Sequence, residues 1–328
     1  MIIRFKPGCR AAELNRIQDK IADLLPGAAL ALGRGFISVR TCRPELLGER
    51  LALIENLPGV HKTELSLKET CPRTLAAPPP ELAGLFKKNA AKKFIIIAGP
   101  CAIEDEASYL AAAVRLKAAG VGALRAALFK PRTSPYSFQG VGGKGFAIIK
   151  KAKSRTGLAA VTEATSETQL ADISRFCDVV QIGARNMRNY ELLKAAAVSG
   201  KPVLLKRAPG ATLKEWLLSA EYLIKYGNEN IILCERGDSF SKPDPRGLDL
   251  KMIRRALTAA ALPVIADPSH AAGDNDLVPA QALAAVRAGA DGLMLETALN
   301  PESAIMDGRQ TLTIPAFAGL LKEIRKLR

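Results

Sequence analysis

The chain has 328 residues, of which 48% are hydrophobic, and a formal net charge of +15. This length suits one large domain with a small additional one, and the apolar runs are too short to cross a membrane. Because the basic residues are scattered and aromatic residues make up only 5%, we expect neither a nucleic-acid nor a membrane partner. Six irregularly spaced cysteines and no visible secretory signal indicate reduced thiols in a cytoplasmic protein.

Residues 1–70 have the pattern of a small separate domain. Apolar runs predict strands at Ile2–Phe5, Ala28–Leu32, Phe36–Val39 and Val60–Leu67, and helical periodicity predicts helices at Leu14–Leu25 and Leu46–Leu57. The order βαββαβ is the ferredoxin-like arrangement. Its polar residues form no catalytic cluster, so we predict a regulatory or oligomerisation role for this domain.

Residues 71–92 are predicted to be a linker. Pro72 and Pro78–Pro80 resist regular structure, and only Glu81–Phe86 has the pattern of a short helix.

Residues 93–328 alternate between short apolar runs and helical patterns. The runs are Phe94–Ala98, Ala123–Ala127, Leu158–Thr162, Asp178–Ile182, Pro202–Leu205, Asn230–Leu233, Pro263–Ala266 and Asp291–Leu295. The helical patterns are Glu106–Ala119, Gly145–Arg155, Ser166–Phe176, Asn189–Val198, Leu213–Tyr226, Asp249–Ala261, Asp276–Ala288 and Ile314–Leu327. Strands that alternate with helices imply a parallel sheet, and eight such units predict a (β/α)8 TIM barrel. Its active site should lie at the carboxyl ends of the strands.

Four residues that can bind a metal follow these strands. They are Cys101, His270, Glu296 and Asp307. Each alone has an ordinary structural alternative: a buried thiol, a loop ion pair or a turn residue. A closed barrel, however, places the ends of its first, seventh and eighth strands side by side. A sulfur, an imidazole and two carboxylates there suit a divalent transition metal such as Mn, Fe, Co or Zn.

Several cations also fall near the strand ends. They are Arg125, Lys130, Arg132, Arg185, Lys206 and Arg236. Each alone could be a surface residue, but Arg125 and Lys206 lie in apolar runs, where a charge needs a partner. Glu163 could be that partner, or could bind a water or a substrate proton. Cations gathered at one mouth repel each other without an anionic ligand, so we predict a ligand with at least two anionic groups. The loop Lys130–Gly140 offers Arg132, Thr133 and Ser134 as further donors to a phosphate.

These residues resemble those of the type I β 3-deoxy-D-arabino-heptulosonate 7-phosphate (DAHP) synthases, in a superfamily that also contains the 3-deoxy-octulosonate 8-phosphate synthases. The matching motifs are Ala98–Cys101, Lys130–Gly140, Thr162–Ala164, Gln181–Asn186, Leu204–Arg207, Cys234–Gly237, Asp267–His270 and Asp307–Gln310. They cover nearly the whole predicted barrel in order. The ferredoxin-like unit resembles the feedback domain of some members.

The resemblance implies the condensation of phosphoenolpyruvate with erythrose 4-phosphate, the first shikimate step. By position it implies a divalent metal on Cys101, His270, Glu296 and Asp307, with Cys101, His270, Lys130 and Glu163 as catalytic residues. The phosphoenolpyruvate site would comprise Arg125, Lys130, Glu163, Ala184, Arg185, Lys206 and Arg236. Lys130, Pro131, Arg132, Thr133, Ser134 and Asp307 would receive the aldose phosphate. It further implies Phe or Tyr as an effector of residues 1–70, and a homo-oligomer, commonly a tetramer.

The chain also departs from the family pattern. Ala126, Ala127 and Leu128 stand where glycines are usual after the arginine of the second strand, and Thr297–Asn300 lacks the usual histidine after the metal glutamate. Two alternatives therefore stay open: an octulosonate-phosphate synthase or a relative that uses another aldose phosphate, and a barrel that binds ligands without catalysis.

Overall fold

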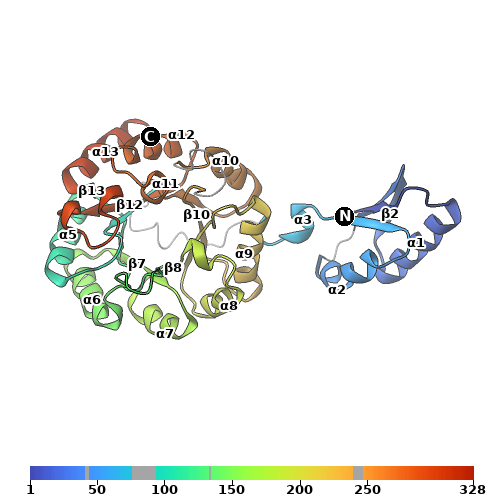
Figure 1. Cartoon of the computed structure of the whole chain (residues 1–328), viewed down its shortest axis with the longest axis horizontal. Coiled ribbons are helices and arrows are strands. Elements are labelled where there is room, and N and C mark those ends of the chain that lie inside the picture. Colours follow the sequence, from blue (N-terminus) through green and yellow to red (C-terminus); the bar gives the residue numbers. More distant parts are fainter. Residues whose placement is uncertain (41–43, 76–93, 133, 239–246) are drawn as a thin grey trace. The chain divides into compact units, whose positions relative to one another are not determined.

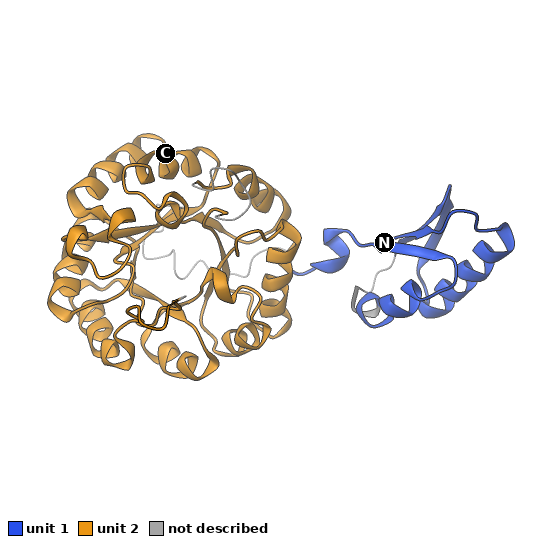
Figure 2. Cartoon of the chain, in the orientation of Figure 1, with its two compact units in different colours: residues 1–73 blue, residues 74–328 orange. Residues whose placement is uncertain are grey.

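The computed structural model describes the chain except residues 41–43, 76–93, 133 and 239–246, which are drawn as a grey trace in Figure 1. The chain divides into two compact units, Met1–Arg73 and Thr74–Arg328 (Figure 2). The predicted helix at Glu81–Phe86 and most of the predicted linker lie outside the described residues.

The first unit is a four-stranded antiparallel sheet with the ferredoxin-like order β2-β3-β1-β4. Its elements are β1 (Ile2–Phe5), α1 (Ala11–Leu24), β2 (Ala29–Gly33), β3 (Phe36–Arg40), α2 (Pro44–Glu55), β4 (Val60–Glu64) and α3 (Leu67–Thr70). The βαββαβ prediction is confirmed. The buried residues Ile3, Ile37 and Val39 of the sheet share one core with Ile17 and Ile21 of α1.

One boundary in this unit was predicted wrongly. The apolar pattern extended the last strand to Leu67, but β4 ends at Glu64 and Leu67 begins the short helix α3. The reason is local, because Ser66 and Glu69 form a capping box in which the backbone N–H of Ser66 donates to Glu69 Oε2 at 2.8 Å. This cap favours a helical turn over another strand residue.

The second unit is a closed parallel barrel, which confirms the predicted (β/α)8 architecture. Its eight strands are β5 (Ile95–Gly99), β6 (Ala123–Arg125), β7 (Ala159–Ala164), β8 (Val179–Ile182), β9 (Val203–Lys206), β10 (Ile231–Glu235), β11 (Val264–Ala266) and β12 (Gly292–Ala298). Neighbours in this order pair in parallel, and β12 pairs with both β11 and β5, so the sheet closes on itself (Figure 1). Apolar side chains from all eight strands pack together in one cluster inside the barrel.

Helices surround the barrel, and most of them begin at a side-chain cap. They are α5 (Glu106–Ala119), α6 (Gly145–Thr156), α7 (Glu167–Phe176), α8 (Tyr190–Val198), α9 (Leu213–Lys225), α10 (Leu250–Ala259), α12 (Val278–Arg287) and α13 (Ile314–Lys326). Ser166 and Thr212 are two such caps, since each accepts a hydrogen bond from a backbone N–H of the first turn. Gly120 ends α5 with φ of 90°, a conformation that a side chain would strain.

Several short elements near the mouth were not predicted, among them one α-helix and one strand. The helix α11 (Pro268–Ala272) is too short to show a helical period, and β13 (Leu312–Thr313) is a two-residue strand that pairs with β12. Both turn out to support the candidate site. Among the described residues, Cys9, Cys71, Cys101, Cys177 and Cys234 are free thiols, and no helix has the length and hydropathy needed to span a membrane.

Candidate active site

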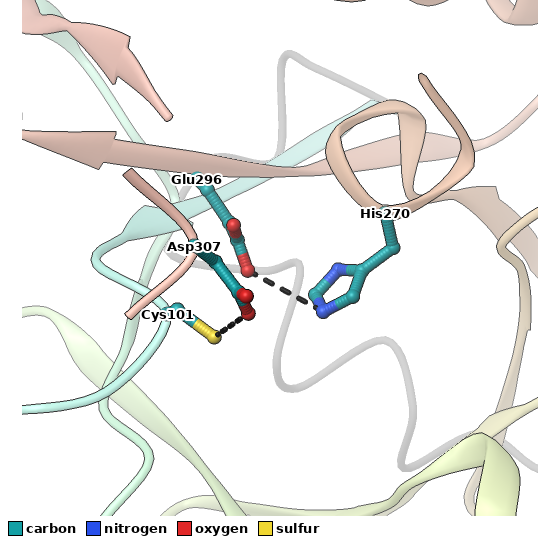
Figure 3. A group of neighbouring side chains, drawn as sticks. All are labelled: Cys101, His270, Glu296 and Asp307. Carbon is teal, nitrogen blue, oxygen red and sulfur yellow. Dashed lines mark hydrogen bonds and ion pairs between the residues drawn. The ribbon is translucent and has the colours of Figure 1, made fainter. Parts of the chain in front are cut away.

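The four predicted metal-binding residues lie together at the carboxyl ends of the barrel strands. One ligand atom from each of Cys101, His270, Glu296 and Asp307 lies within 4.8 Å of all the others. Cys101 Sγ is 2.9 Å from Asp307 Oδ2, and His270 Nε2 is 3.4 Å from Glu296 Oε1 (Figure 3). The sequence therefore predicted this juxtaposition correctly, although the residues are up to 206 positions apart.

Local structure explains how each side chain reaches the cluster. Cys101 follows the end of β5, and Glu296 lies within β12, the strand that closes the barrel onto β5. His270 lies on α11, whose N-cap Asp267 accepts a hydrogen bond from the His270 backbone N–H at 3.1 Å. Asp307 has φ of 56°, the only positive φ at a residue other than glycine in the described chain. Aspartate is one of the few residues besides glycine that adopt this left-handed conformation readily.

The chemistry of this cluster fits a divalent transition metal. Cys101 and Glu296 are 2% and 0% exposed, so their polar atoms have little access to water. Glu296 Oε1 is buried and accepts no hydrogen bond of normal geometry from the described residues, although Arg125 Nη1 lies 2.9 Å away. A thiolate, an imidazole nitrogen and two carboxylates together favour Zn, Fe, Co or Mn over Mg or Ca.

The surroundings set the protonation states of these ligands. Burial, with a smaller contribution from the charge of Glu296, raises the pKa of the Cys101 thiol well above its usual value. Burial lowers the pKa of His270 and outweighs the opposite effect of Asp267. Burial alone would raise the pKa of Asp307, but the hydrogen bond from Cys101 and nearby positive charges lower it. Without a metal, therefore, the imidazole is neutral and the thiol keeps its proton at neutral pH.

Asp267 links the metal cluster to a buried cation. Its Oδ2 atom lies 2.8 Å from His270 Nδ1 and also accepts a hydrogen bond from Lys206 Nζ. Asp267 and Lys206 are both buried. Burial would raise the pKa of Asp267, but His270 and Lys206 hold it well below the usual value. One ionised carboxylate thus lies against Nδ1 of the imidazole, while Nε2 faces Glu296 of the candidate metal cluster.

A second buried ion pair lies across the mouth. Lys130 Nζ is 2.8 Å from Glu163 Oε2, and the two side chains are 9% and 4% exposed. Burial opposes both charges, but their mutual attraction raises the pKa of Lys130 and lowers that of Glu163. Glu163 was predicted as a partner for Arg125 or Lys206, but its ion-pair partner is Lys130. Arg125 lies beside Glu296 instead, and Lys206 is paired with Asp267.

Arg125 joins the cation group to the metal cluster. Its side chain is 2% exposed, Nη1 is 2.9 Å from Glu296 Oε1, and Nη2 donates to the Cys101 carbonyl at 3.2 Å. The buried guanidinium therefore places a positive charge directly beside the candidate metal cluster. An anionic ligand bound there could contact Arg125 and a metal ion at the same time.

The remaining predicted anion-binding residues are more exposed. Arg185 Nη1 donates to the carbonyl of Pro131 at 2.7 Å, which joins the loop after β8 to the loop after β6. Arg236 Nη2 donates to the His270 carbonyl at 3.3 Å, and Ala184 begins a short 3₁₀ turn next to Arg185. Arg132 and Ser134 are exposed on the loop, whereas Thr133 lies outside the described residues.

Sequence reasoning missed three residues that hold the candidate metal-binding side chains in place. They are Asp267, Ser269 and Gln310. The Ser269 hydroxyl accepts from the Glu296 backbone N–H at 2.9 Å, and Gln310 Nε2 donates to Glu296 Oε2 at 2.7 Å. Only Asp267 left a usable signal, since an aspartate before a proline and three residues before His270 is typical of a helix N-cap.

The closed barrel and this site define a (β/α)8-barrel protein with a metal-binding cluster beside a group of buried cations. The family to which it belongs follows from comparison with known proteins. The model of the DAHP synthetase I family matches residues 86–328, and the chain belongs to this family.

Known relatives agree with this assignment. The chain is 44% identical over 235 residues to phospho-2-dehydro-3-deoxyheptonate aldolase of Thermotoga maritima, covering 71% of this chain and 70% of the relative. It is 35% identical to 2-dehydro-3-deoxyphosphooctonate aldolase of Desulfatibacillum aliphaticivorans, covering 71% and 92%. The crystal structure of the Thermotoga maritima DAHP synthase matches with a TM-score of 0.81 at 33% identity, over 99% of this chain and 96% of that one. That match includes the small first unit as well as the barrel.

Proposed function

We propose that the protein is a metal-dependent DAHP synthase. It condenses phosphoenolpyruvate with D-erythrose 4-phosphate and water to DAHP and phosphate, the first step of the shikimate pathway. The observation that carries this proposal is that the Cys-His-Glu-Asp cluster lies directly beside buried cations. Arg125 Nη1 is 2.9 Å from Glu296 Oε1, which joins the two groups. The 44% identity to the Thermotoga maritima relative supports the same activity.

The cations at the mouth have a physical task in this reaction. Two phosphorylated substrates repel each other, and Arg125, Lys206, Arg185 and Arg236 would reduce that repulsion by binding phosphoenolpyruvate. Pro131, Arg132, Thr133 and Ser134 would receive the phosphate of the aldose. Lys206 and Lys130 are held in place before substrate arrives, because Lys206 is paired with Asp267 and Lys130 with Glu163.

The carbon–carbon bond forms when C3 of phosphoenolpyruvate attacks the aldehyde carbon of the sugar. A metal held by Cys101, His270, Glu296 and Asp307 would supply a Lewis acid for that aldehyde. Lys130 donates a proton to the alkoxide that develops, and Glu163 keeps Lys130 charged for this role. Water then adds at C2, and phosphate leaves with cleavage of its C–O bond.

The proposal is tested by phosphate release from phosphoenolpyruvate and erythrose 4-phosphate, with and without a chelator. Chelator-sensitive turnover is the expected result. Turnover that survives complete metal removal would contradict the metal dependence. No turnover in folded, metal-replete protein would favour the alternative of a barrel that binds without catalysis.

A rival sugar distinguishes this activity from the octulosonate branch. Relatives named as 2-dehydro-3-deoxyphosphooctonate aldolases are 31% to 35% identical, lower than the Thermotoga maritima relative. We therefore expect erythrose 4-phosphate to be used in strong preference to arabinose 5-phosphate. Turnover with the five-carbon sugar alone would show that Thr297–Asn300 marks a change of substrate.

The metal, the effector and the assembly extend the same proposal. Reconstitution of the metal-free protein with Mn, Fe, Co and Zn in turn should restore turnover, and metal analysis of protein from cells should identify the native ion.

We propose that the ferredoxin-like unit binds Phe or Tyr as a feedback effector, that the protein acts in the cytoplasm, and that it forms a homotetramer. Deletion of residues 1–73 should abolish inhibition by the effector while turnover persists, and light scattering should give the mass of four chains.

A further inference from the structure

Glu296 is held through both of its carboxylate oxygens. Oε1 faces His270 Nε2 at 3.4 Å and Arg125 Nη1 at 2.9 Å, whereas Oε2 accepts a hydrogen bond from Gln310 Nε2 at 2.7 Å. Glu296 is fully buried, so water does not replace a lost donor at low cost. The amide of Gln310 therefore determines which oxygen is directed away from the metal cluster and which one faces it.

Gln310 belongs to the same turn as the other carboxylate ligand. The turn comprises residues 307–310, with Asp307 as the N-cap of the 3₁₀ helix Gly308–Gln310. The Gln310 backbone N–H donates to the Asp307 carbonyl at 3.2 Å, and the Thr311 hydroxyl donates to the same carbonyl at 2.9 Å. Gln310 thus contacts the backbone of Asp307 and the side chain of Glu296.

The turn is fixed to the barrel on both sides. A side chain at Gly308 would bring its Cβ to 2.3 Å from the Pro301 carbonyl oxygen, so the backbone there packs without space for one. After the turn, Leu312 of β13 pairs with Thr297 of β12, the residue that follows Glu296. This pairing keeps the Gln310 amide beside the Glu296 carboxylate.

We propose that Gln310 is a positioning residue for the metal site, and that it fixes Glu296 and Asp307 in one mutual geometry. This inference rests on the proposed metal site and goes beyond it, because Gln310 itself is not a ligand. A hydrogen-bonded carboxylate that is already oriented loses less freedom when it binds a cation. Removal of such a partner typically costs roughly 10- to 100-fold in metal affinity.

The test compares cobalt binding in the full-length wild-type protein, Gln310→Met and Arg309→Met. Gln310→Met keeps the length of the side chain but removes the donor. Arg309 is the matched control, because it lies in the same turn with a side chain 79% exposed and paired with Asp274 rather than with a metal ligand. Competition with a coloured chelator gives the Kd for Co²⁺, and the thiolate-to-cobalt absorption band reports coordination by Cys101.

We expect Gln310→Met to raise the Kd for Co²⁺ roughly 10- to 100-fold. Arg309→Met should stay near the wild-type value. Calorimetric titration of the metal-free proteins with phosphoenolpyruvate should give equal affinities for wild type and Gln310→Met, because the hydrogen bond of the Gln310 side chain within the described part of the chain goes to Glu296 and not to a cation. A general loss of structure would weaken both kinds of binding together. If Gln310→Met does not fold, Gln310→Asn takes its place, since a donor one methylene shorter cannot keep the 2.7 Å contact.

Each outcome decides between the two proposals. Equal Co²⁺ affinity in wild type and the Gln310 variant would overturn the positioning role while leaving the metal site intact. Absence of a thiolate-to-cobalt band in the wild type would overturn the metal site itself, and this inference with it. Loss of phosphoenolpyruvate binding in proportion to loss of Co²⁺ binding would assign Gln310 a purely structural role.

Discussion

Asp267 Oδ2 lies 2.8 Å from His270 Nδ1 and also accepts a hydrogen bond from Lys206. One buried carboxylate therefore contacts a metal-binding residue and a cation of the proposed phosphoenolpyruvate site. The contact to His270 Nδ1 leaves Nε2 as the nitrogen that can bind a metal, so the orientation of the imidazole depends on Asp267.

We predict that Asp267→Asn weakens metal binding by roughly 10- to 100-fold, because the amide orients the imidazole less strongly than a carboxylate and does not raise its basicity. Equilibrium dialysis against Zn²⁺ or Co²⁺ measures the change. Asp291→Asn is the control: Asp291 also accepts a backbone hydrogen bond, from Val264 at 2.8 Å, but it precedes β12 at the opposite end of the barrel. An unchanged Kd in Asp267→Asn would show that α11 alone orients His270.

The Lys130–Glu163 pair gives a prediction that separates chemistry from binding. Lys130→Met should lower kcat far more than it raises the KM for phosphoenolpyruvate, since Arg125 and Lys206 remain to bind the anion while the proton donor is lost. Steady-state kinetics with the concentrations of both substrates varied gives the changes in kcat and in the KM for phosphoenolpyruvate separately. A large rise in KM with little change in kcat would instead make Lys130 a binding residue.

The same pair predicts an effect on stability. Lys130→Met leaves Glu163 buried without its ion-pair partner, and such a loss costs ~3–5 kcal/mol in the free energy of unfolding. Lys130→Met together with Glu163→Gln should recover part of this cost, because the second change removes the unpaired charge. Urea denaturation of the two single variants and the double variant measures the coupling. Additive losses would mean that the pair contributes little to stability.

The barrel was predictable because each buried strand is a short apolar run and the long helices between the strands have apolar residues at helical spacing. The residues just beyond the runs were predictable as a group for the same reason, since strand ends in a closed barrel meet at one mouth. This argument needed no side-chain geometry, and it placed Cys101, His270 and Glu296 together correctly.

What the sequence did not reveal are contacts that depend on short or irregular segments. The helix α11 has five residues, fewer than two turns, so no helical period marks it, and its only sequence signal is the N-cap pattern of Asp267 before Pro268. Gln310 reaches Glu296 through a turn whose Asp307 takes a left-handed conformation, which no periodicity marks. Partners of this kind are set by tertiary packing rather than by local pattern.

Gly183 offers a test of how tightly Glu163 is held. A Cβ at this position would lie 2.1 Å from Glu163 Oε1, although the backbone itself, with φ of −65°, accepts any residue. We predict that Gly183→Ala displaces Glu163 from Lys130 and lowers kcat, with a fold that stays intact by circular dichroism. Gly319→Ala is a control for loss of a glycine, because Gly319 lies within α13 without a left-handed backbone, and the added Cβ meets nothing within 4 Å beyond its own helix backbone. Wild-type kcat in Gly183→Ala would show that Glu163 can move without loss of catalysis.

The protonation states of the ligands predict how metal binding depends on pH. The pKa of Cys101 is raised well above its usual value by burial, whereas the pKa values of His270 and Asp307 are lowered. Between pH 7 and 8 the metal-free site therefore has a protonated thiol, a neutral imidazole and an ionised Asp307. Because metal binding requires the thiolate, each ion should release about one proton, and the affinity should rise about tenfold per pH unit. Calorimetry in two buffers with different ionisation enthalpies counts the protons, and Cys101→Ala should release none. Proton release that persists in Cys101→Ala would assign the proton to another ligand.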